Sequence, residues 1–194
     1  MKGNDKTMNE RIHDATLYED IPSPEGREEK EMAVYRLLKE LQIPYERLDH
    51  EPMETMEACQ DVDKLLHIHM CKNLFLCNSQ KTVFYLVMMP GEKKFKTKEL
   101  SKQIGSARLS FASEEYMVKF LNIHPGAVSI MGLMNDTDKR VNLLIDEDVL
   151  KEEYLGCHPC VNTASLQLKT RDVLEKFLPY TGHGYRTVHL TGED

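Results

Sequence analysis

Residues 72–89, KNLFLCNSQKTVFYLVMM, contain two short apolar runs on either side of a polar link. The runs extend from Asn73 to Cys77 and from Thr82 to Met89, and Asn78-Ser79-Gln80-Lys81 separates them. This spacing predicts a β-hairpin of two buried strands. Antiparallel pairing is therefore expected within the core of this protein.

Apolar residues at helical spacing occur on both sides of this hairpin. Val34, Leu37, Leu38 and Leu41 fall at i, i+3, i+4 and i+7, which predicts a helix that ends before Pro44. Further helices are predicted after a capping Thr55, from a capping Thr97 to Ile104 before Gly105, from Ser113 to Leu121, and from a capping Thr170 through Val173, Leu174, Phe177 and Leu178.

The remaining strands are predicted from alternation and from turn residues. They are Tyr45 to His50, Ala127 to Met134 paired with Arg140 to Ile145 in a second hairpin, Thr163 to Leu168, and Tyr185 to Leu190. Because hairpins and single helices are mixed without regular alternation, the sequence predicts an α+β fold with a mixed, mostly antiparallel sheet. One domain is expected over residues 29–194. Residues 1–28 lack clear periodicity and are expected to form a loosely attached N-terminal extension.

The composition indicates a globular protein without a membrane partner. The 194 residues are 41% hydrophobic, and no apolar run approaches the ~20 residues of a membrane helix. Met1 to Asp14 is polar and mixed in charge, so a secretory signal is not expected. The five cysteines are an odd number, which argues against a disulfide framework. We therefore expect a cytoplasmic protein with reduced thiols.

The net charge of −7 is unusual for a protein that binds nucleic acid without specificity. Any nucleic-acid contact must use a local basic patch, and residues 92–108 supply a candidate. Six basic residues, less two acidic ones, give this segment a charge of +4: Lys93, Lys94, Lys96, Lys98, Lys102 and Arg108 against Glu92 and Glu99. A solvated helix face and a phosphate-steering patch are equally good interpretations.

Lys72 stands where a polar segment turns into the first strand of the predicted hairpin. A lysine at a strand end commonly packs its stem on the protein and extends its ammonium to water. It could instead hold a phosphate or polarise an ester carbonyl. The neighbouring Asn73 could donate to the same oxygen. Taken alone, this pair is compatible with both interpretations.

A second polar cluster lies in residues 157–165, CHPCVNTAS. His158 precedes a proline and so favours an extended backbone, and Asn162, Thr163 and Ser165 follow it. One interpretation is a turn that satisfies its own backbone groups. The other is a set of donors and acceptors around a small polar ligand.

Cys157 and Cys160 form a Cys-x-x-Cys, which suggests a redox or zinc site as alternatives. A redox cysteine is activated at a helix N-terminus, whereas a strand-like segment follows these cysteines and the next predicted helix begins only at Thr170. A structural zinc site needs four ligands. His67, His69 and Cys71 could join Cys160, but the sequence has no second Cys-x-x-Cys. We therefore expect neither a metal nor a cofactor.

Three motifs, in order along the chain, resemble a known family. They are KNLFL at 72–76, GAVS at 126–129 followed by GLMND at 132–136, and HPCVNTAS at 158–165. Together they resemble the YbaK-type prolyl-tRNA editing domains, and within them the free-standing members that remove alanine from tRNA for proline. Thr55-Met56-Glu57 also fits the helix that precedes the lysine strand in that family. The resemblance covers about residues 29–190.

The resemblance implies a sheet partly curled into an open barrel, flanked by helices, and hydrolysis of an aminoacyl-tRNA ester without a metal. By position, Lys72 would bind the tRNA terminus and His158 would match the family's histidine. Gly126, Ala127, Val128 and Ser129 would form the glycine-rich loop beside the ester. This chain departs from the family pattern at two positions, because Ile130 replaces a common proline and Cys157 a common phenylalanine.

An aminoacyl ester is already activated, so the site must place water and stabilise an oxyanion rather than supply a nucleophile. We expect Lys72 and Asn73 to bind the terminal adenosine, and backbone N–H groups near Gly126 to Ser129 to face the carbonyl. His158 is expected to orient the ester or its α-amino group, and Asn162 and Thr163 to contact the substrate. The resemblance implies that a ribose hydroxyl of the substrate helps to activate the water.

Specificity is expected to come from pocket size, because one methylene in an apolar pocket gives only about 10 to 200-fold discrimination. Met53, Met56, Leu74 and Val128 are candidate walls of a pocket that admits alanine and excludes proline, and core packing is an equally good role for each. The expected partner is the acceptor end of tRNA for proline, with prolyl-tRNA synthetase or an elongation factor as transient partners. The alternatives are a cysteinyl-tRNA deacylase of the same fold, a non-catalytic tRNA-binding or synthetase-associated module, and a thiol or metal protein.

Overall fold

The predicted hairpin is the centre of the larger of two sheets. The computed structural model describes residues 12–52 and 60–192, and its larger sheet has the strand order β4-β2-β3-β5-β8. Its strands are β2 (Cys71–Asn78), β3 (Phe84–Pro90), β4 (Leu109–Phe111), β5 (Val141–Asp146) and β8 (Tyr185–Val188). β2 pairs antiparallel with β3 and β4, whereas β5 runs parallel to β3 and β8.

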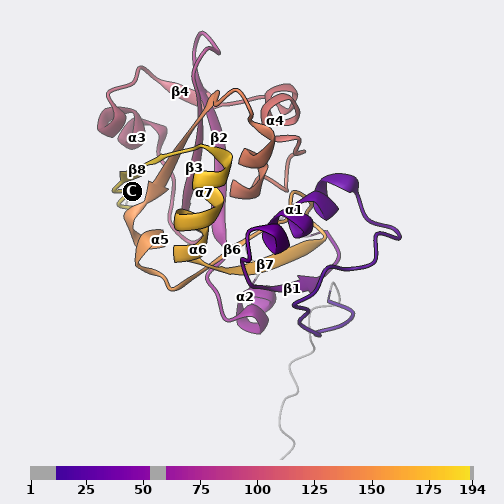
Figure 1. The fold of residues 1–194 in the computed structure, drawn as a ribbon. Helices are drawn as coiled ribbons and strands as arrows, with labels where there is room; N and C mark the ends of the chain where they lie inside the picture. The colour runs from indigo at the N-terminus through magenta and orange to yellow at the C-terminus, as the bar shows by residue number, and fades with distance from the viewer. Residues whose placement is uncertain (1–11, 53–59, 193–194) are drawn as a thin grey trace, which may run out of the picture.

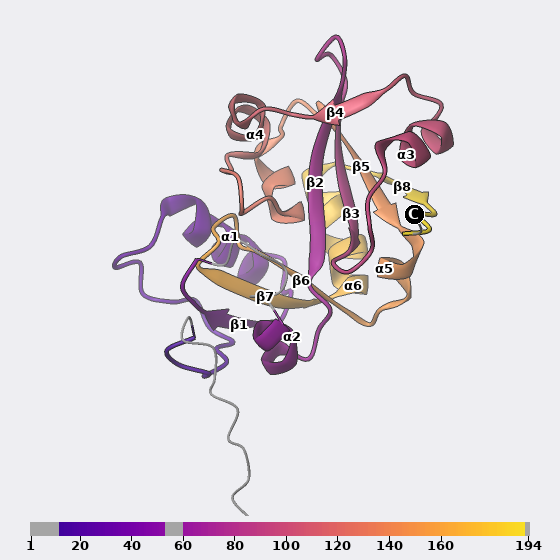
Figure 2. The same cartoon turned by 180° about the vertical axis from the view of Figure 1, so that it is seen from behind.

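The smaller sheet is antiparallel and has the order β1-β7-β6. Its strands are β1 (Tyr45–Asp49), β6 (Tyr154–Cys157) and β7 (Ala164–Lys169). Figures 1 and 2 show this sheet lying across the lower end of β2 and β3. A parallel bridge between Met70 and Gly156 joins the end of β6 to the chain just before β2.

The α+β class and the mixed, mostly antiparallel pairing are confirmed, but two details differ from the prediction. The strands fall into two sheets, where one partly curled sheet was expected. The predicted hairpin of 127–134 with 140–145 is wrong, because Ile130–Asn135 forms a 3₁₀ helix, η1, and β5 pairs with β3 instead. A short apolar run does not distinguish a strand from a buried helical turn, and here the Ser129 hydroxyl caps the turn by accepting from the Met131 N–H.

The helices cover the faces and ends of the sheets. They are α1 (Glu29–Glu40), α2 (Gln60–Leu66), α3 (Thr97–Ile104), α4 (Glu114–Leu121), α5 (Glu147–Lys151) and a last helix made of α6 (Thr170–Asp172), a π turn η2 (Val173–Phe177) and α7 (Leu178–Thr181). Thr97 and Thr170 are the first residues inside their helices, so the predicted capping roles of these two threonines are wrong. The short elements β4, α5 and β6 had no clear sequence signal.

The two faces of the larger sheet contact different cores. Cys71, Phe75 and Cys77 of β2 point into the main core, which also contains residues of α1, α4 and η1. Leu74 and Leu76, at alternate positions, point into a second core that α3 covers with Leu100 and Ile104. This alternation decides on which side each polar residue of β2 lies.

Residues 12–28, the described part of the predicted extension, are attached to β1. Ile12 is 2% exposed and packs with Leu48 and Val62. Tyr18 forms a bridge with Arg47, with backbone hydrogen bonds of 2.9 and 2.8 Å. The Arg27 guanidinium lies 2.7 Å from Asp49. The expected loose attachment is therefore wrong for this part of the extension.

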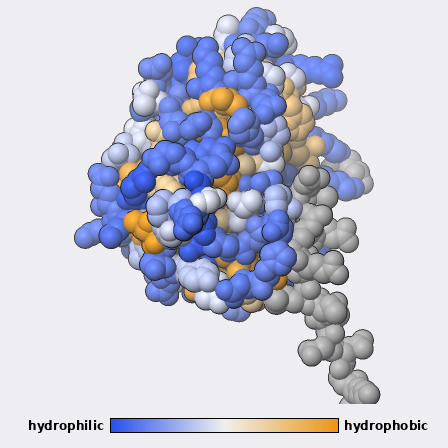
Figure 3. Space-filling model, turned by 90° about the vertical axis from the view of Figure 1, so that its right-hand side faces the viewer, coloured by the Kyte–Doolittle hydropathy of each residue, from blue (hydrophilic) through white to orange (hydrophobic). Residues whose placement is uncertain are grey.

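The helices of the described residues are short. No helix in the described ranges is long and apolar enough to cross a bilayer. The face shown in Figure 3 is mostly hydrophilic, with apolar residues in small separate patches.

The bridge between the two sheets depends on the absence of a side chain at residue 156. A Cβ on Gly156 would lie 2.4 Å from Ile68 Cδ1 and 3.2 Å from Met70 Sδ. β6 therefore approaches the chain before β2 more closely than a residue with a side chain would allow.

We expect Gly156→Ala to lower the free energy of unfolding by about 1–3 kcal/mol, because Ile68 and Met70 must shift to make room. Urea denaturation measures the loss. Adding Ile68→Val, which removes the closest methyl, should recover part of it. Gly184→Ala is the matched control, because a Cβ there meets nothing within 4 Å. Equal losses in the two single variants would contradict the close approach at Gly156.

Candidate functional site

The bridge between the sheets brings the two polar clusters of the sequence to one place. The pairing of Met70 with Gly156 is parallel, and Lys72 and His158 each lie two residues beyond it. The Cys71 thiol also accepts a hydrogen bond from the Gly156 backbone. The backbone therefore places the predicted lysine and histidine at the same level of two neighbouring chain segments.

His158 is held as a neutral acceptor. Its Nδ1 lies 2.8 Å from the Ala164 carbonyl oxygen, which can only accept, so Nδ1 carries the proton. Burial lowers the pKa of His158 to about 4, and the nearby His50 acts in the same direction. The Nε2 atom has no hydrogen-bond partner within residues 12–52 and 60–192. At neutral pH it is therefore an available lone pair.

His50 belongs to the same cluster, although the sequence analysis did not select it. Its Nδ1 donates to the Glu51 carbonyl at 2.9 Å, so its Nε2 accepts from the Ser165 hydroxyl at 2.9 Å. The His50 ring centroid lies 6.1 Å from that of His158. Burial lowers the pKa of His50. The sequence around His50 does not indicate this role, because its hydrogen-bond partner Ser165 lies 115 residues further along the chain, in β7.

The predicted glycine-rich loop lies against the second cluster. Gly126 has φ of +87°, which favours glycine, and a Cβ there would lie 3.5 Å from Asn162 Nδ2. Ser129 is fully buried, and its hydroxyl hydrogen-bonds to the Cys157 thiol. The loop from 126 to 129 and the segment from 157 to 162 are therefore neighbours.

Two backbone donors of this loop remain available. The Ala127 N–H already donates to the His124 carbonyl at 3.2 Å, so it cannot also bind a substrate oxygen without breaking that turn. The N–H groups of Val128 and Ser129 have no partner within the described part of the chain. Ile130 is the first residue of η1, where an N–H has no intrahelical partner, so isoleucine and the family's proline are both compatible with the turn.

Lys72 and Asn73 point to opposite faces of β2. The Lys72 ammonium lies on the side of Leu74 and donates to the Lys93 carbonyl at 2.6 Å. Burial lowers the pKa of Lys72, whereas the Glu92 carboxylate acts to raise it. Asn73 points to the side of Cys71, and its Nδ2 lies 3.4 Å from the Cys71 carbonyl. The Asn73 Oδ1 atom is buried without a partner among the described residues, so it is an acceptor available to a ligand.

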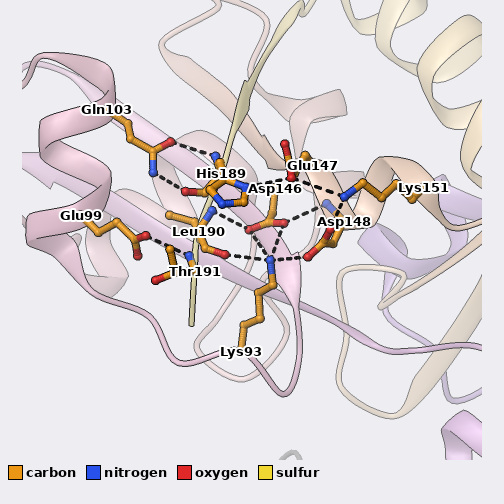
Figure 4. A network of polar contacts seen from close by, with 10 residues as sticks. All are labelled: Lys93, Glu99, Gln103, Asp146, Glu147, Asp148, Lys151, His189, Leu190 and Thr191. Carbon is orange, nitrogen blue, oxygen red and sulfur yellow. Dashed lines mark hydrogen bonds and ion pairs between the residues drawn. The ribbon is translucent and has the colours of Figure 1, made fainter. Parts of the chain in front are cut away.

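The carbonyl that holds Lys72 is itself fixed by a buried ion pair. The Lys93 ammonium lies 3.0 Å from Asp146 Oδ1, 2.6 Å from Asp148 and 2.8 Å from the Leu190 carbonyl (Figure 4). Asp146 is fully buried and also accepts from the Asp148 and Leu190 N–H groups. The network thereby connects the loop after β3, the start of α5 and the segment after β8.

The cysteines do not have the environment of reactive thiols. Cys157 and Cys160 are buried, and burial raises the pKa of each to about 12. His69 is exposed and Cys71 is buried, although both line one cavity. The described residues contain no group of three or more His, Cys, Asp or Glu that could hold a metal ion.

The other predicted site residues are only partly placed. Thr163 is exposed and its carbonyl accepts from the His50 N–H at 3.0 Å. Leu74 and Val128 are partly buried against the two cores. Met53 and Met56, together with the helix cap predicted at Thr55, lie outside the described residues.

Comparisons with known proteins give a consistent result. Residues 50–176 match the model of the aminoacyl-tRNA editing domain. The prolyl-tRNA editing protein ProX of Acetoanaerobium sticklandii is 34% identical over 158 residues, which cover 81% of this chain and 96% of that protein. The prolyl-tRNA synthetase associated domain-containing protein 1 of Bos taurus is 30% identical over 155 residues, with 78% and 90% covered. The crystal structure of hypothetical protein APE2540 shares the fold, with a TM-score of 0.63 at 16% identity, over 81% of this chain and 97% of that one.

We expect His158→Gln to weaken the pH dependence of stability between about pH 6.5 and pH 4. An unfolded histidine binds its proton near pH ~6.5, whereas folded His158 does so only near pH 4. The unfolded state therefore holds more protons in this window, and the free energy of unfolding falls as the pH falls.

This single group contributes a slope of up to about 1 kcal/mol per pH unit, which urea denaturation at pH 7, 6 and 5 measures. The variant should lose that part of the slope. His67→Gln, at an exposed histidine, should keep the slope of the unmodified protein. An unchanged slope in His158→Gln would show that His158 is not buried in its neutral form.

Proposed function

Because this chain belongs to the aminoacyl-tRNA editing domain family, we propose that it hydrolyses the ester of mischarged tRNA for proline, with Ala-tRNA(Pro) as its substrate. The observation that carries the proposal is the parallel bridge between Met70 and Gly156, because Lys72 and His158 each follow it by two residues. The loop from 126 to 129 lies beside the same segment. A relative named for prolyl-tRNA editing, which this chain covers almost completely, supports tRNA for proline as the carrier.

The chemistry requires an oxyanion site more than a nucleophile. The carbonyl of an aminoacyl ester develops negative charge when water attacks it, and fixed N–H groups stabilise that charge. We assign this role to the N–H groups of Val128 and Ser129, which are available and lie next to a buried helical turn. The buried thiols of Cys157 and Cys160 do not compete as nucleophiles, because burial keeps them protonated.

We assign to His158 the role of accepting a hydrogen bond from the substrate or the attacking water. Its Nε2 lone pair can accept from the α-ammonium group, from a ribose hydroxyl or from the attacking water, and its tautomer is fixed by the Ala164 carbonyl. His50 is assigned a positioning role, because both of its nitrogens already have partners. Together with Ser165 it closes one side of the histidine cluster.

We assign to Lys72 the role of binding the terminal phosphate or ribose of the tRNA. Its present partner is a neutral carbonyl, so an anionic phosphate can compete for the ammonium. Partial burial strengthens such a contact, since few waters solvate the charge. Asn73 has an acceptor oxygen free on the other face of the strand, where it can bind a hydroxyl or an ammonium group of the substrate.

We assign alanine, rather than cysteine, as the amino acid that is removed, on the basis of the family resemblance. The size of the pocket would favour alanine over larger side chains. A cysteinyl-tRNA deacylase of the same fold is the competing assignment. The two amino acids differ by one sulfur atom, so this distinction needs the substrates themselves.

We expect Lys72→Ala to lower kcat/KM for deacylation of Ala-tRNA(Pro) by on the order of 10²-fold or more, because a partly buried contact between the ammonium and the terminal phosphate or ribose is lost. A deacylation assay with purified mischarged tRNA measures the rate. Lys39→Ala, at an exposed lysine of α1, is the control and should leave the rate unchanged. Near-normal activity of Lys72→Ala would show that Lys72 does not contribute to the site.

A panel of mischarged tRNAs tests the assigned substrate. The unmodified protein should deacylate Ala-tRNA(Pro) faster than Cys-tRNA(Pro) and should spare Pro-tRNA(Pro). Faster turnover of the cysteinyl ester would show that the protein is a cysteinyl-tRNA deacylase instead. Binding of tRNA without turnover of any ester would show a non-catalytic module.

The double variant Cys157→Ser with Cys160→Ser tests the thiol and metal alternatives. It should fold with some loss of stability, because both sulfurs are buried, and should retain most of its deacylase activity. EDTA should not inhibit the unmodified protein. Loss of activity with chelator, together with zinc in elemental analysis, would restore the metal interpretation.

A further inference from the structure

The segment that receives the Lys72 hydrogen bond continues into an exposed basic surface. Lys93 itself does not belong to this surface, because its ammonium is bound by Asp146 and Asp148. The remaining basic residues of the segment are exposed: Lys94, Lys96, Lys98, Lys102 and Arg108. We call these five residues the α3 face, since they lie on α3 and its two flanking loops.

The charge of the α3 face is mostly unpaired. Lys96, Lys98, Lys102 and Arg108 have no acidic partner within ion-pair distance among the described residues. Single lysines without an ion pair among the described residues also lie elsewhere, such as Lys39, Lys119 and Lys139, but the α3 face gathers four such basic residues in one segment. Of the two acidic residues in the segment, Glu99 accepts from the Thr191 N–H at 2.9 Å, and Glu92 is exposed near Lys72. Unpaired positive charge in a chain of net charge −7 marks a surface for an anionic partner.

Two aromatic rings lie within the same surface. Phe111 of the edge strand β4 is 61% exposed, and its ring meets that of the partly buried Phe95 edge-on at 6.3 Å. Phe95 stands between Lys94 and Lys96, and Phe111 follows three residues after Arg108. Basic side chains interleaved with accessible rings are typical of surfaces that bind RNA, where the ring supports a base or a ribose.

The α3 face is continuous with Lys72. Lys72 points to the face of the larger sheet that α3 covers, and its ammonium binds the carbonyl of Lys93 at 2.6 Å. Lys98 and Lys102 are four residues apart and project from the same side of α3. A phosphate backbone lying along α3 would therefore lead directly to the residue assigned to the tRNA terminus.

We propose that the α3 face binds the phosphate backbone of the tRNA acceptor arm and guides its 3′ end to Lys72. This inference rests on the proposed function, and it adds the surface by which a protein of net negative charge holds its RNA. The contacts are to phosphates, so they supply affinity and orientation rather than recognition of a base sequence.

The test is a quadruple variant, Lys96→Gln, Lys98→Gln, Lys102→Gln and Arg108→Gln. All four side chains are exposed, so the variant should fold normally. We expect KM for Ala-tRNA(Pro) to rise by on the order of 10-fold or more, with kcat at saturation nearly unchanged. The slope of log KM against log salt should fall by about one for each phosphate that the variant no longer neutralises. Fluorescence anisotropy with uncharged tRNA for proline should show the same loss of affinity without any catalytic step.

The matched control removes the same amount of charge elsewhere. Lys39, Lys119, Lys139 and Lys169 are exposed and lie outside the α3 face, and their joint replacement by Gln also removes four charges. This control should keep most of the tRNA affinity and the salt slope. Equal losses in the two quadruple variants would show a general charge effect and would overturn the α3 face as the binding surface.

The outcomes separate this inference from the proposed function. If the unmodified protein deacylates mischarged tRNA but the α3 variant keeps its KM, affinity and salt slope, the α3 face does not bind RNA. That result would also be obtained if the surface served a protein partner. If the unmodified protein binds tRNA through the α3 face but hydrolyses no ester, the inference holds and the proposed function fails.

Discussion

The junction of the two sheets, and with it the candidate site, depends on the close approach of β6 to the chain before β2. Gly156 has no side chain, and its parallel bridge with Met70 is the point at which the two sheets meet. Two residues beyond this isolated bridge, the chain reaches Lys72 on one side and His158 on the other. Each sheet contributes one half of the candidate site, so neither half is complete without this contact. A Cβ at this point would therefore disturb the geometry of the site as well as the stability of the fold.

The polar groups around the junction are divided between fixed and available ones. His50, Ser165 and the Ala127 N–H have partners, whereas His158 Nε2, Asn73 Oδ1 and the Val128 and Ser129 N–H groups have none among the described residues. Unsatisfied groups are costly when buried, so an arrangement of several around one junction favours a ligand that satisfies them. The buried Lys93–Asp146 ion pair fixes the loop beside Lys72 and leaves the rest of that loop's charge for the solvent side.

Much of the fold could be predicted from the sequence because its long elements are strongly periodic. The hairpin of β2 and β3, the helices α1, α3 and α4, and the strand β7 follow from apolar spacing. The strand predicted at 127–134 was wrong because a buried 3₁₀ turn and a buried strand have the same apolar content. β4, α5 and β6 were missed because elements of three to five residues carry too little pattern. The site motifs were visible by resemblance, but His50 and the pairing of Gly156 with Met70 depend on contacts between distant segments, which no local pattern contains.

A double-mutant cycle between Lys72 and His158 tests the central claim most directly. The rates of Lys72→Ala, His158→Gln and the double variant are compared with that of the unmodified protein, with Ala-tRNA(Pro) as substrate. If the junction sets both residues around one bound ester, the double variant should be far less impaired than the product of the two single losses. Losses that multiply fully, or a normal rate in either single variant, would contradict a shared site at the junction of the two sheets.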